Sequence, residues 1–278
     1  MKMESQAARV ARAHESIRER AGAPCEVALV LGSGLGHLAG AVSDAVVVPY
    51  GEIDGFPVST APGHKGQLVI GTLYGRRTVI MEGRLHLYEG WEPRDIGLAV
   101  YLLRALGATN FVVTNAAGGL NPAFEAGSVM LIEDHLNFTG GSPLIGPNDD
   151  EIGLRFPDQT QLYHPDLRAV AEKAAMETGT PLYKGIYCGL KGPELETSAE
   201  RRFYRSAGGD AVGMSTVIEV IAANHAGMKV LGVSAITNAA TGVDDEPDTI
   251  ESVVAMAANC GVRIEAILAA AFPNLPKA

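Results

Sequence analysis

Short apolar runs alternate with segments of helical periodicity along most of this chain, and this alternation limits the fold more than any other feature. The apolar runs predict strands at residues 27–31, 45–48, 67–72, 78–81, 110–114, 128–132, 182–187 and 229–236. Helical patterns occupy residues 94–106, 165–178, 198–206, 216–225 and 249–272. Strands that alternate with helices indicate an α/β fold with helices on both faces of the sheet. The runs at 67–72 and 78–81, joined across "LYGRR", predict an antiparallel hairpin and therefore a mixed sheet.

The length of 278 residues, 47% of them hydrophobic, allows one large core. The sequence contains no repeat, low-complexity tract or Gly/Ser linker, so we expect a single domain over residues 1–278. Its longest irregular stretch is residues 137–165, "NFTGGSPLIGPNDDEIGLRFPDQTQLYHP". A loop of this length inside a compact domain is usually functional or packs on a neighbouring subunit.

Charge and cysteine content limit the partners and the compartment. The formal net charge of −10 argues against nucleic acid or an anionic membrane as a partner, because both select basic surfaces. Three cysteines without CxxC spacing suit a reducing compartment and give no sign of zinc. The N-terminus lacks the apolar core of a signal peptide, and we find no run approaching the roughly 20 apolar residues of a membrane span. We therefore expect a soluble, cytoplasmic protein.

A glycine-rich turn, "GSGLG", directly follows the first predicted strand. Such turns often present backbone N–H groups to a phosphate, but the dinucleotide fingerprint G-x-G-x-x-G fails here because its third position falls on His37. No GxxxxGK[ST] motif occurs, which excludes a P-loop. A turn that merely lets strand and helix pack is the alternative. Ser33 favours an anion site, since its hydroxyl lies between two glycines at the mouth of the turn.

A second polar cluster lies in "MEGRLHLYEG", where Arg84, His86 and Tyr88 alternate with leucines. If this segment continues a strand, the period of two places the three polar side chains on one face. The planar guanidinium of arginine suits phosphate oxygens, and histidine can add a donor. An ordinary exposed strand face is the alternative, although such a face more often carries Lys, Thr and Glu.

Three further segments offer anion contacts. His64 lies in the Pro/Gly loop "STAPGHKGQ" and would, taken alone, more often be a solvent-exposed histidine. Small residues from Ala116 to Gly119 allow a ligand to approach bare backbone. Ser215 lies at a predicted strand-to-helix junction in "AVGMSTV", but Val217 breaks the G-x-S-x-G elbow of a serine hydrolase. Several anion-binding elements without a metal motif or a covalent nucleophile indicate free inorganic phosphate as a reactant.

Seven separated motifs give this chain a recognisable resemblance to a known family. They are "GSGLG", "GRLHLYEG", "TNAAGGLNP", "GPNDDEIGLRFP", "GPELETSAE", "AVGMSTVIEVIAA" and "ITNAATG", in order between about residues 25 and 245. Together they resemble the trimeric class of purine nucleoside phosphorylases. The resemblance implies one α/β domain with a mixed, partly barrel-like sheet, and reversible phosphorolysis of a purine nucleoside to free base and ribose 1-phosphate. It implies neither a metal nor a cofactor.

Carried over position by position, the resemblance implies roles for individual residues. The residues implied to bind phosphate are Ser33, His64, Arg84, His86, Ala116 through its amide, and Ser215. Those implied to bind the nucleoside are Tyr88 and Met214 at the ribose, and Glu196, Asn238, Ala117, Gly118 and Val212 around the purine. Phe156 would reach the neighbouring subunit's site in a homotrimer, and Asn238, His86 and Glu196 would be catalytic. The chain departs from the family at Leu195, commonly aromatic, and at Ile250, often a histidine near the ribose 5′-hydroxyl.

The implied chemistry agrees with these residue types. Glu196 can accept from the N1–H of a 6-oxopurine such as the base of inosine or guanosine, a proton that neutral adenine lacks. Donors at the base, such as the Asn238 amide, stabilise the negative charge of the leaving purine. The alternatives are a 5′-methylthioadenosine or 5′-methylthioinosine phosphorylase of the same family, a nicotinamide-dependent oxidoreductase, and a nucleoside-binding module without catalysis.

Overall fold

The computed structural model describes residues 4–61, 63–243 and 249–277, and for Ile250 it describes the backbone alone. All eight predicted strands and all five predicted helices lie in this part of the chain. The strands are β1 Val27–Val30, β2 Ser43–Pro49, β3 Gln67–Leu73, β4 Arg76–Glu82, β5 Asn110–Gly119, β6 Val129–Asn137, β7 Tyr183–Gly189, β8 Ala211–Gly213 and β9 Lys229–Ala239. The helices are α1 Gln6–Ala21, α2 Pro93–Ala105, α3 Pro165–Glu177, α4 Ser198–Ser206, α5 Val217–His225 and α6 Ile250–Ala271.

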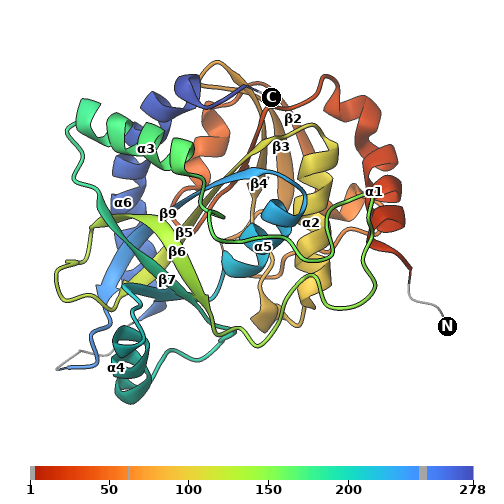
Figure 1. The fold of residues 1–278 in the computed structure, drawn as a ribbon. Coiled ribbons are helices and arrows are strands. Elements are labelled where there is room, and N and C mark those ends of the chain that lie inside the picture. Colours follow the sequence, from red (N-terminus) through yellow and green to blue (C-terminus); the bar gives the residue numbers. More distant parts are fainter. Residues whose placement is uncertain (1–3, 62, 244–248, 278) are drawn as a thin grey trace.

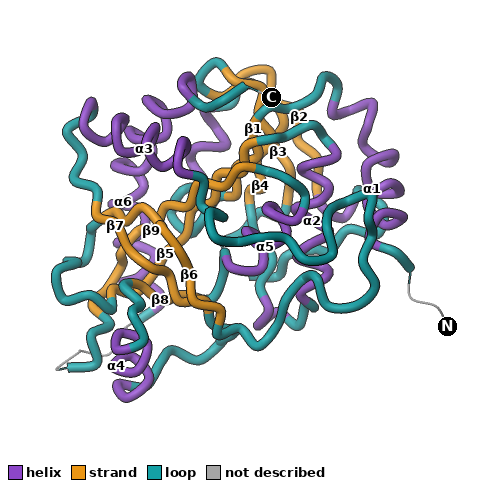
Figure 2. Tube along the Cα trace, viewed as in Figure 1, coloured by secondary structure: helices purple, strands orange, loops and turns teal. Residues whose placement is uncertain are grey.

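The nine strands form one mixed sheet that closes on itself at one end. Their order is β2-β3-β4-β1-β5-β8-β7-β6-β9, and β9 pairs back onto β5. The strands β5, β8, β7, β6 and β9 therefore form a five-stranded barrel, while β2, β3, β4 and β1 extend it as an open sheet (Figure 2). The predicted hairpin is present as antiparallel β3 and β4. The mixed, partly barrel-like α/β fold implied by the resemblance is confirmed.

Helices cover both faces of the open sheet, so that successive residues of β1 enter different cores. Ala28 and Val30 join one core together with buried side chains of α1, α2 and α5. Val27 and Leu29 join the other, together with side chains of α3 and α6. This alternation follows from the period of two in a strand. Figure 1 shows α2 and α5 side by side on one side of the sheet, with α3 and α6 beyond the other.

The helix α6 corrects one expectation from the sequence. Residues Glu251–Asn274 are long and apolar enough, by length and composition, to cross a membrane, with a mean hydropathy of 1.6. We expected no segment approaching the length of a membrane span, and this was wrong for Glu251–Asn274. Arg263 and Glu265 interrupt its apolar residues, so the sequence does not show one continuous apolar run there. Its buried side chains, among them Cys260, Ile264 and Leu268, belong to the core that α3 and β1 share, as expected of a helix that covers a sheet.

Candidate active site

The candidate site lies at the edge where the parallel strands end. The strands β4, β1, β5 and β9 are parallel neighbours, so their carboxyl ends meet there. Ser33 follows β1, Arg84 follows β4, and Asn238 is the second-to-last residue of β9. The predicted residues come from distant parts of the chain, and this shared edge is what brings them together.

The glycine turn after β1 packs closely against β5 and α6. The Gly32 N–H donates to Thr114 Oγ1 on β5 at 2.9 Å, and a Cβ at this position would lie 2.7 Å from the Asn115 Cα. Gly34 has a φ of +82°, and a Cβ there would lie 2.5 Å from the carbonyl carbon of Ala257 on α6. Side chains at either position would displace the loop. Together with His64, Ser33 lines a hollow of about 320 Å³ beside this loop.

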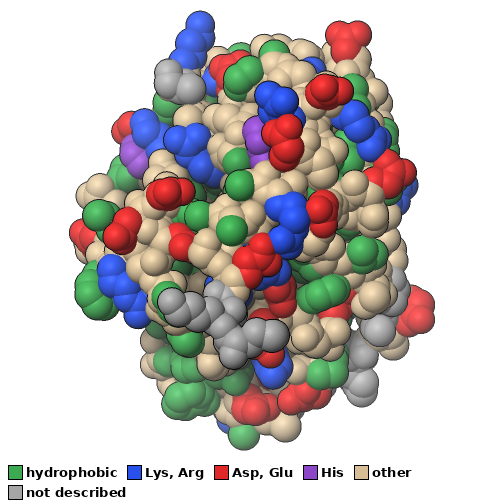
Figure 3. Space-filling model, turned by 90° about the vertical axis from the view of Figure 1, so that its right-hand side faces the viewer, with side chains coloured by type: hydrophobic (Ala, Val, Ile, Leu, Met, Phe, Trp, Pro, Cys, Tyr) green, Lys and Arg blue, Asp and Glu red, His purple; other side chains and the backbone are tan. Residues whose placement is uncertain are grey.

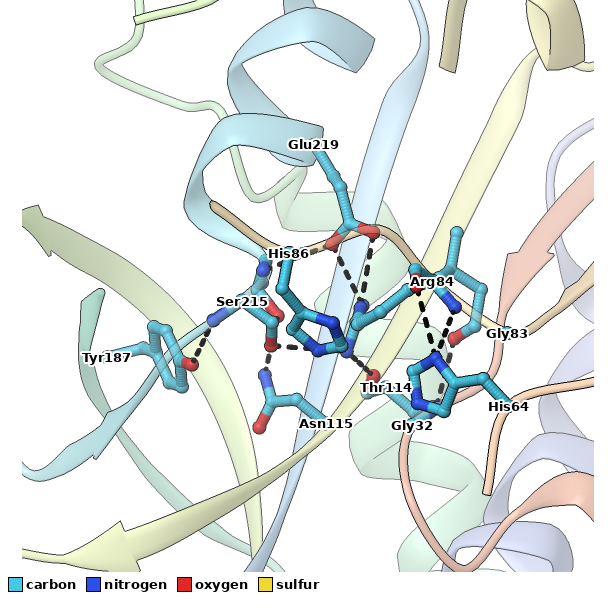
Figure 4. A network of polar contacts seen from close by, with 12 residues as sticks. Gly32, His64, Gly83, Arg84, His86, Thr114, Asn115, Tyr187, Ser215 and Glu219 are labelled. Carbon is cyan, nitrogen blue, oxygen red and sulfur yellow. Dashed lines mark hydrogen bonds and ion pairs between the residues drawn. The ribbon is translucent and has the colours of Figure 1, made fainter. Parts of the chain in front are cut away.

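The guanidinium of Arg84 is almost fully buried, with 2% of its side chain exposed. Its Nε and Nη2 donate to the two oxygens of Glu219 at 3.2 and 2.8 Å. Its Nη1 donates to the Thr114 carbonyl at 2.8 Å and to Ser215 Oγ at 3.2 Å. Arg84 is therefore fixed in orientation and lies beside a second predicted phosphate ligand, as Figure 4 shows.

The segment after β4 differs from the extended strand end that the alternation predicted. The strand ends at Glu82, and Gly83 turns the chain with a φ of +120°. Tyr88 lies in a 3₁₀ turn over Leu87–Glu89, so the period of two does not apply there. The ring of His86 nevertheless stacks on Tyr88, with centroids 4.5 Å apart. The two side chains are neighbours because the chain turns.

Each histidine of the cluster has one ring nitrogen held by the protein. His86 Nδ1 lies 2.9 Å from Glu89 Oε1, so this nitrogen donates to the carboxylate. His64 Nδ1 lies 2.9 Å from the backbone N–H of Arg84 and 3.1 Å from its carbonyl. Because an amide N–H can only donate, the shorter contact makes His64 Nδ1 an acceptor and places the ring hydrogen on Nε2.

Burial and charge set the protonation of this cluster. Burial, followed by repulsion from His86, lowers the pKa of His64 to about 4. Burial also lowers the pKa of His86. For Glu89 burial acts in the opposite direction, but hydrogen bonds from His86 and Thr60 outweigh it and lower the pKa to about 2. At neutral pH the site therefore holds a neutral His64 and an ionised Glu89.

Ser215 is presented by a tight turn at the start of α5. Thr216 has a φ of 72° and a ψ of −53°, and the Val217 N–H donates to the Ser215 carbonyl at 2.8 Å. This is a γ-turn of the rare, strained form. Thr216 Oγ1 accepts from Asn115 Nδ2 at 2.9 Å and lies 3.1 Å from Ser215 Oγ. The turn is thereby tied to β5, the strand that carries Ala116.

The residues assigned to the purine gather where β5, β8 and β9 pair. A Cβ on Gly118 would lie 2.9 Å from the Cβ of Ala240 and 3.4 Å from Asn238 Nδ2, so a glycine is what lets these strands pack this closely. Asn238 Oδ1 accepts from Thr237 Oγ1 at 2.9 Å, which fixes the direction of the amide. Ala117, which precedes Gly118 in β5, is buried. Met214 is packed against Gly192, the residue before the "PELET" segment.

Glu196 has a cationic neighbour that the sequence did not reveal. Its side chain is 5% exposed, and its Oε2 lies 3.7 Å from Nε of Arg201 on α4. A positive charge at this distance favours the ionised carboxylate, which is the form that accepts a hydrogen bond from N1–H. The side chains at 196 and 201 are brought together because helix α4 begins at Ser198, two residues after Glu196.

Two predicted residues, Phe156 and Leu195, are not brought into the cluster. Phe156 is 87% exposed, with the Arg155 guanidinium 5.5 Å from the centre of its ring. Leu195 is 52% exposed. The side chain of Ile250 lies outside the described residues, so its predicted place near the ribose stays a prediction.

Sequence reasoning missed the carboxylates that hold the donors. Glu219 and Glu89 accept from Arg84 and His86. The spacing of Thr216 and Glu219, T-x-x-E before an apolar run, is the signature of a capping box and could have indicated a helix start there. The contact to Arg84 spans 135 positions, and no local pattern predicts it.

Comparisons with known proteins agree with this geometry. The phosphorylase superfamily matches residues 26–273. A Bacillus subtilis protein named purine nucleoside phosphorylase 1 is 50% identical over 239 residues, which is 86% of this chain and 88% of that protein. The Bos taurus purine nucleoside phosphorylase is 49% identical over 77% of this chain and 75% of its own length. A Schistosoma mansoni purine nucleoside phosphorylase solved with inosine superposes with a TM-score of 0.92 at 35% identity, covering 98% of each chain.

Proposed function

This chain belongs to the phosphorylase superfamily, as one of its purine nucleoside phosphorylases, and we propose that its site performs reversible phosphorolysis of 6-oxopurine nucleosides such as inosine and guanosine. The enzyme is a pentosyltransferase: it moves the ribosyl group from the purine to phosphate. The observation that carries the proposal is the buried Arg84, whose guanidinium lies beside Ser215, a second oxyanion donor. Both lie at the edge where β5 and β9 present Gly118 and Asn238.

In the forward reaction, a phosphate oxygen forms a bond to C1′ as the C1′–N9 bond of the nucleoside breaks. The electron pair of the broken bond moves onto the purine, which becomes the neutral free base by taking up the proton that the phosphate gives up. The phosphate remains bonded to C1′ and leaves as part of ribose 1-phosphate. Arg84, Ser215 and Ser33 are proposed to hold the phosphate in place for attack. His64 adds an Nε2–H donor, because its Nδ1 is occupied by the Arg84 amide.

At the base, we assign Asn238 as the donor that stabilises the developing charge on the purine at N7 or O6. Glu196 accepts from N1–H, and Arg201 supports its ionised form. Neutral adenine has no hydrogen at N1, so it would offer the Glu196 carboxylate no hydrogen-bond donor at that position. This contact favours the 6-oxopurine assignment over the alternative, a 5′-methylthioadenosine phosphorylase of the same family.

The assembly and surroundings of the enzyme form the remaining part of the proposal. Exposed large apolar side chains gather in the long loop between β6 and α3, at Ile145, Leu154 and Phe156. Such a group on a surface is typical of a protein contact, which supports a homotrimer in which Phe156 reaches the neighbouring site. On the face in Figure 3, acidic and basic side chains are intermingled. With the net charge of −10, this supports a cytoplasmic enzyme that binds neither nucleic acid nor membrane. We assign it no metal or other cofactor.

The base assignment is tested by incubating the enzyme and phosphate with inosine or adenosine and measuring the free base. Inosine should be cleaved and adenosine cleaved far more slowly. The variant Asn238→Ala should lower kcat for inosine by roughly 10²- to 10³-fold, as expected for the loss of one transition-state donor. Equal rates for the two nucleosides in the wild type would contradict the role assigned to Glu196.

A further inference from the structure

A single carboxylate, that of Glu219, contacts both Arg84 and the turn that presents Ser215. Glu219 lies in the first turn of α5 and is 3% exposed. Its Oε1 accepts from Arg84 Nε at 3.2 Å, and its Oε2 accepts from Arg84 Nη2 at 2.8 Å. The same Oε2 also accepts the backbone N–H of Thr216 at 3.0 Å. Figure 4 shows Glu219 on the opposite side of the guanidinium from Thr114.

The first contact fixes the plane of the Arg84 guanidinium. Two parallel bonds to one carboxylate define both the position and the orientation of a guanidinium, which a single bond does not. The remaining nitrogen, Nη1, is then aimed at the Thr114 carbonyl and at Ser215 Oγ. Glu219 therefore sets the orientation in which the Arg84 guanidinium can donate hydrogen bonds to an oxyanion.

The second contact supports the turn that presents Ser215. Thr216 occupies a left-handed conformation, with a φ of 72°, that a β-branched residue rarely adopts. Such conformations persist where surrounding contacts hold them. The bond from the Thr216 N–H to Glu219 is one of these contacts, and the bond from Asn115 to the Thr216 hydroxyl is another.

We propose that Glu219 is the positioning residue of the phosphate site, because one buried carboxylate sets both the orientation of Arg84 and the γ-turn that presents Ser215. It acts on phosphate through these two residues. The inference rests on the proposed function, since it assigns a role within the same phosphate site.

A role through charge alone would have the opposite effect on phosphate. A carboxylate beside Arg84 reduces the positive potential that a phosphate meets. If this were its only effect, removing the negative charge would strengthen phosphate binding. If Glu219 acts by positioning, removing it weakens phosphate binding although the site becomes more positive. The sign of the change therefore separates the two roles.

The test is the variant Glu219→Gln, assayed for inosine phosphorolysis with phosphate and inosine varied in turn. We expect the KM for phosphate to rise by roughly tenfold or more and kcat to fall, while the KM for inosine changes by less than about threefold. A phosphate KM equal to or below that of the wild type would overturn the proposal. Stabilisation of each folded variant by added phosphate, measured by thermal unfolding, gives a readout that does not depend on turnover.

Two further variants keep the result interpretable. Glu26→Gln is the matched control, because Glu26 accepts from Nε of the buried Arg76 at 2.9 Å in an ion pair away from the site. It should lower the melting temperature and leave the phosphate KM unchanged. Glu219→Asp keeps the charge and shortens the side chain, and it decides the question if Glu219→Gln fails to fold. Positioning predicts a raised phosphate KM for Glu219→Asp, whereas a wild-type value contradicts it.

The outcomes also separate this inference from the proposed function. If wild-type enzyme cleaves inosine equally well without phosphate, the proposed function fails. If wild-type cleavage requires phosphate and the Glu219 variants keep a wild-type phosphate KM, only the role of Glu219 is refuted.

Discussion

At the residue scale, the tautomers of the two histidines in the site are set by the groups that hydrogen-bond to them. Glu89 holds one nitrogen of His86, and the Arg84 amide occupies one nitrogen of His64. Each ring is thereby left with one nitrogen for other contacts. The residue types could be selected from the sequence, but their tautomers could not, because these depend on contacts with the folded backbone.

The buried His64 gives a prediction about stability and pH. A histidine in an unfolded chain titrates near 6.5, whereas in the folded protein the pKa of His64 is lowered to about 4. Between these values the unfolded chain binds a proton that folded His64 excludes. The free energy of unfolding should therefore fall as the pH decreases from about 6.5 to about 4. The lowered pKa of His86 acts in the same direction.

Urea unfolding of the wild type and of His64→Gln, each at about pH 7 and about pH 5, measures this contribution. The variant should lose less stability than the wild type between the two values, because Gln does not titrate. An equal loss in both proteins would show that His64 does not carry the effect.

At the element scale, the fold could be predicted further than the site. Apolar runs located eight strands, because their side chains alternate between two cores. The strand β8 was indicated only by the strand-to-helix junction at Ser215, since its three residues, Ala211–Gly213, are too few to show a period. The alternation of polar and apolar side chains after β4 predicted that this strand continues. That prediction was wrong, because Gly83 turns the chain there. Pairings such as Arg84 with Glu219 arise only when distant elements meet.

The packing of the glycine turn on α6 gives a prediction at this scale. Gly34→Ala places a Cβ within 2.5 Å of the backbone of Ala257 and also strains a φ of +82°. Gly75 is a matched control, because its φ is +78° and a Cβ there meets nothing within 4 Å. We expect Gly75→Ala to cost about 1 kcal/mol of unfolding free energy through strain alone. Gly34→Ala should cost clearly more.

The same variant should raise the KM for phosphate, because the displaced loop carries Ser33. Steady-state kinetics and denaturant unfolding of both alanine variants provide the comparison. Equal effects of the two substitutions on stability and on phosphate KM would mean that the loop does not depend on its contact with α6.

At the scale of the whole molecule, the open sheet joins the barrel at β5, which pairs with β1 and with β9, and Gly118 and Asn238 lie near the ends of β5 and β9. The long loop between β6 and α3 is tied to the N-terminal helix, because Asp149 accepts from the backbone N–H of Gln6 at 2.6 Å. Phe156 follows a few residues later and remains exposed. The loop is thus held in place at Asp149, while the ring of Phe156, further along it, points outward.

This arrangement predicts that activity requires an oligomer. Light scattering at assay concentration should give the mass of a trimer. Phe156→Ala should raise the KM for inosine while leaving the mass unchanged, because it removes a nucleoside contact and little of the interface. A fully active monomer would refute the proposed assembly, and a wild-type KM in a trimeric variant would refute the role of Phe156.

The most direct test of the central claim, that the edge of the sheet binds phosphate as a reactant, is the phosphate dependence of inosine cleavage. The enzyme, freed of phosphate by dialysis, is incubated with inosine at increasing phosphate concentrations, and hypoxanthine and ribose 1-phosphate are measured. Cleavage should saturate with phosphate and be negligible without it, and the two products should form in equal amounts. Release of hypoxanthine with free ribose, at a rate independent of phosphate, would contradict the central claim.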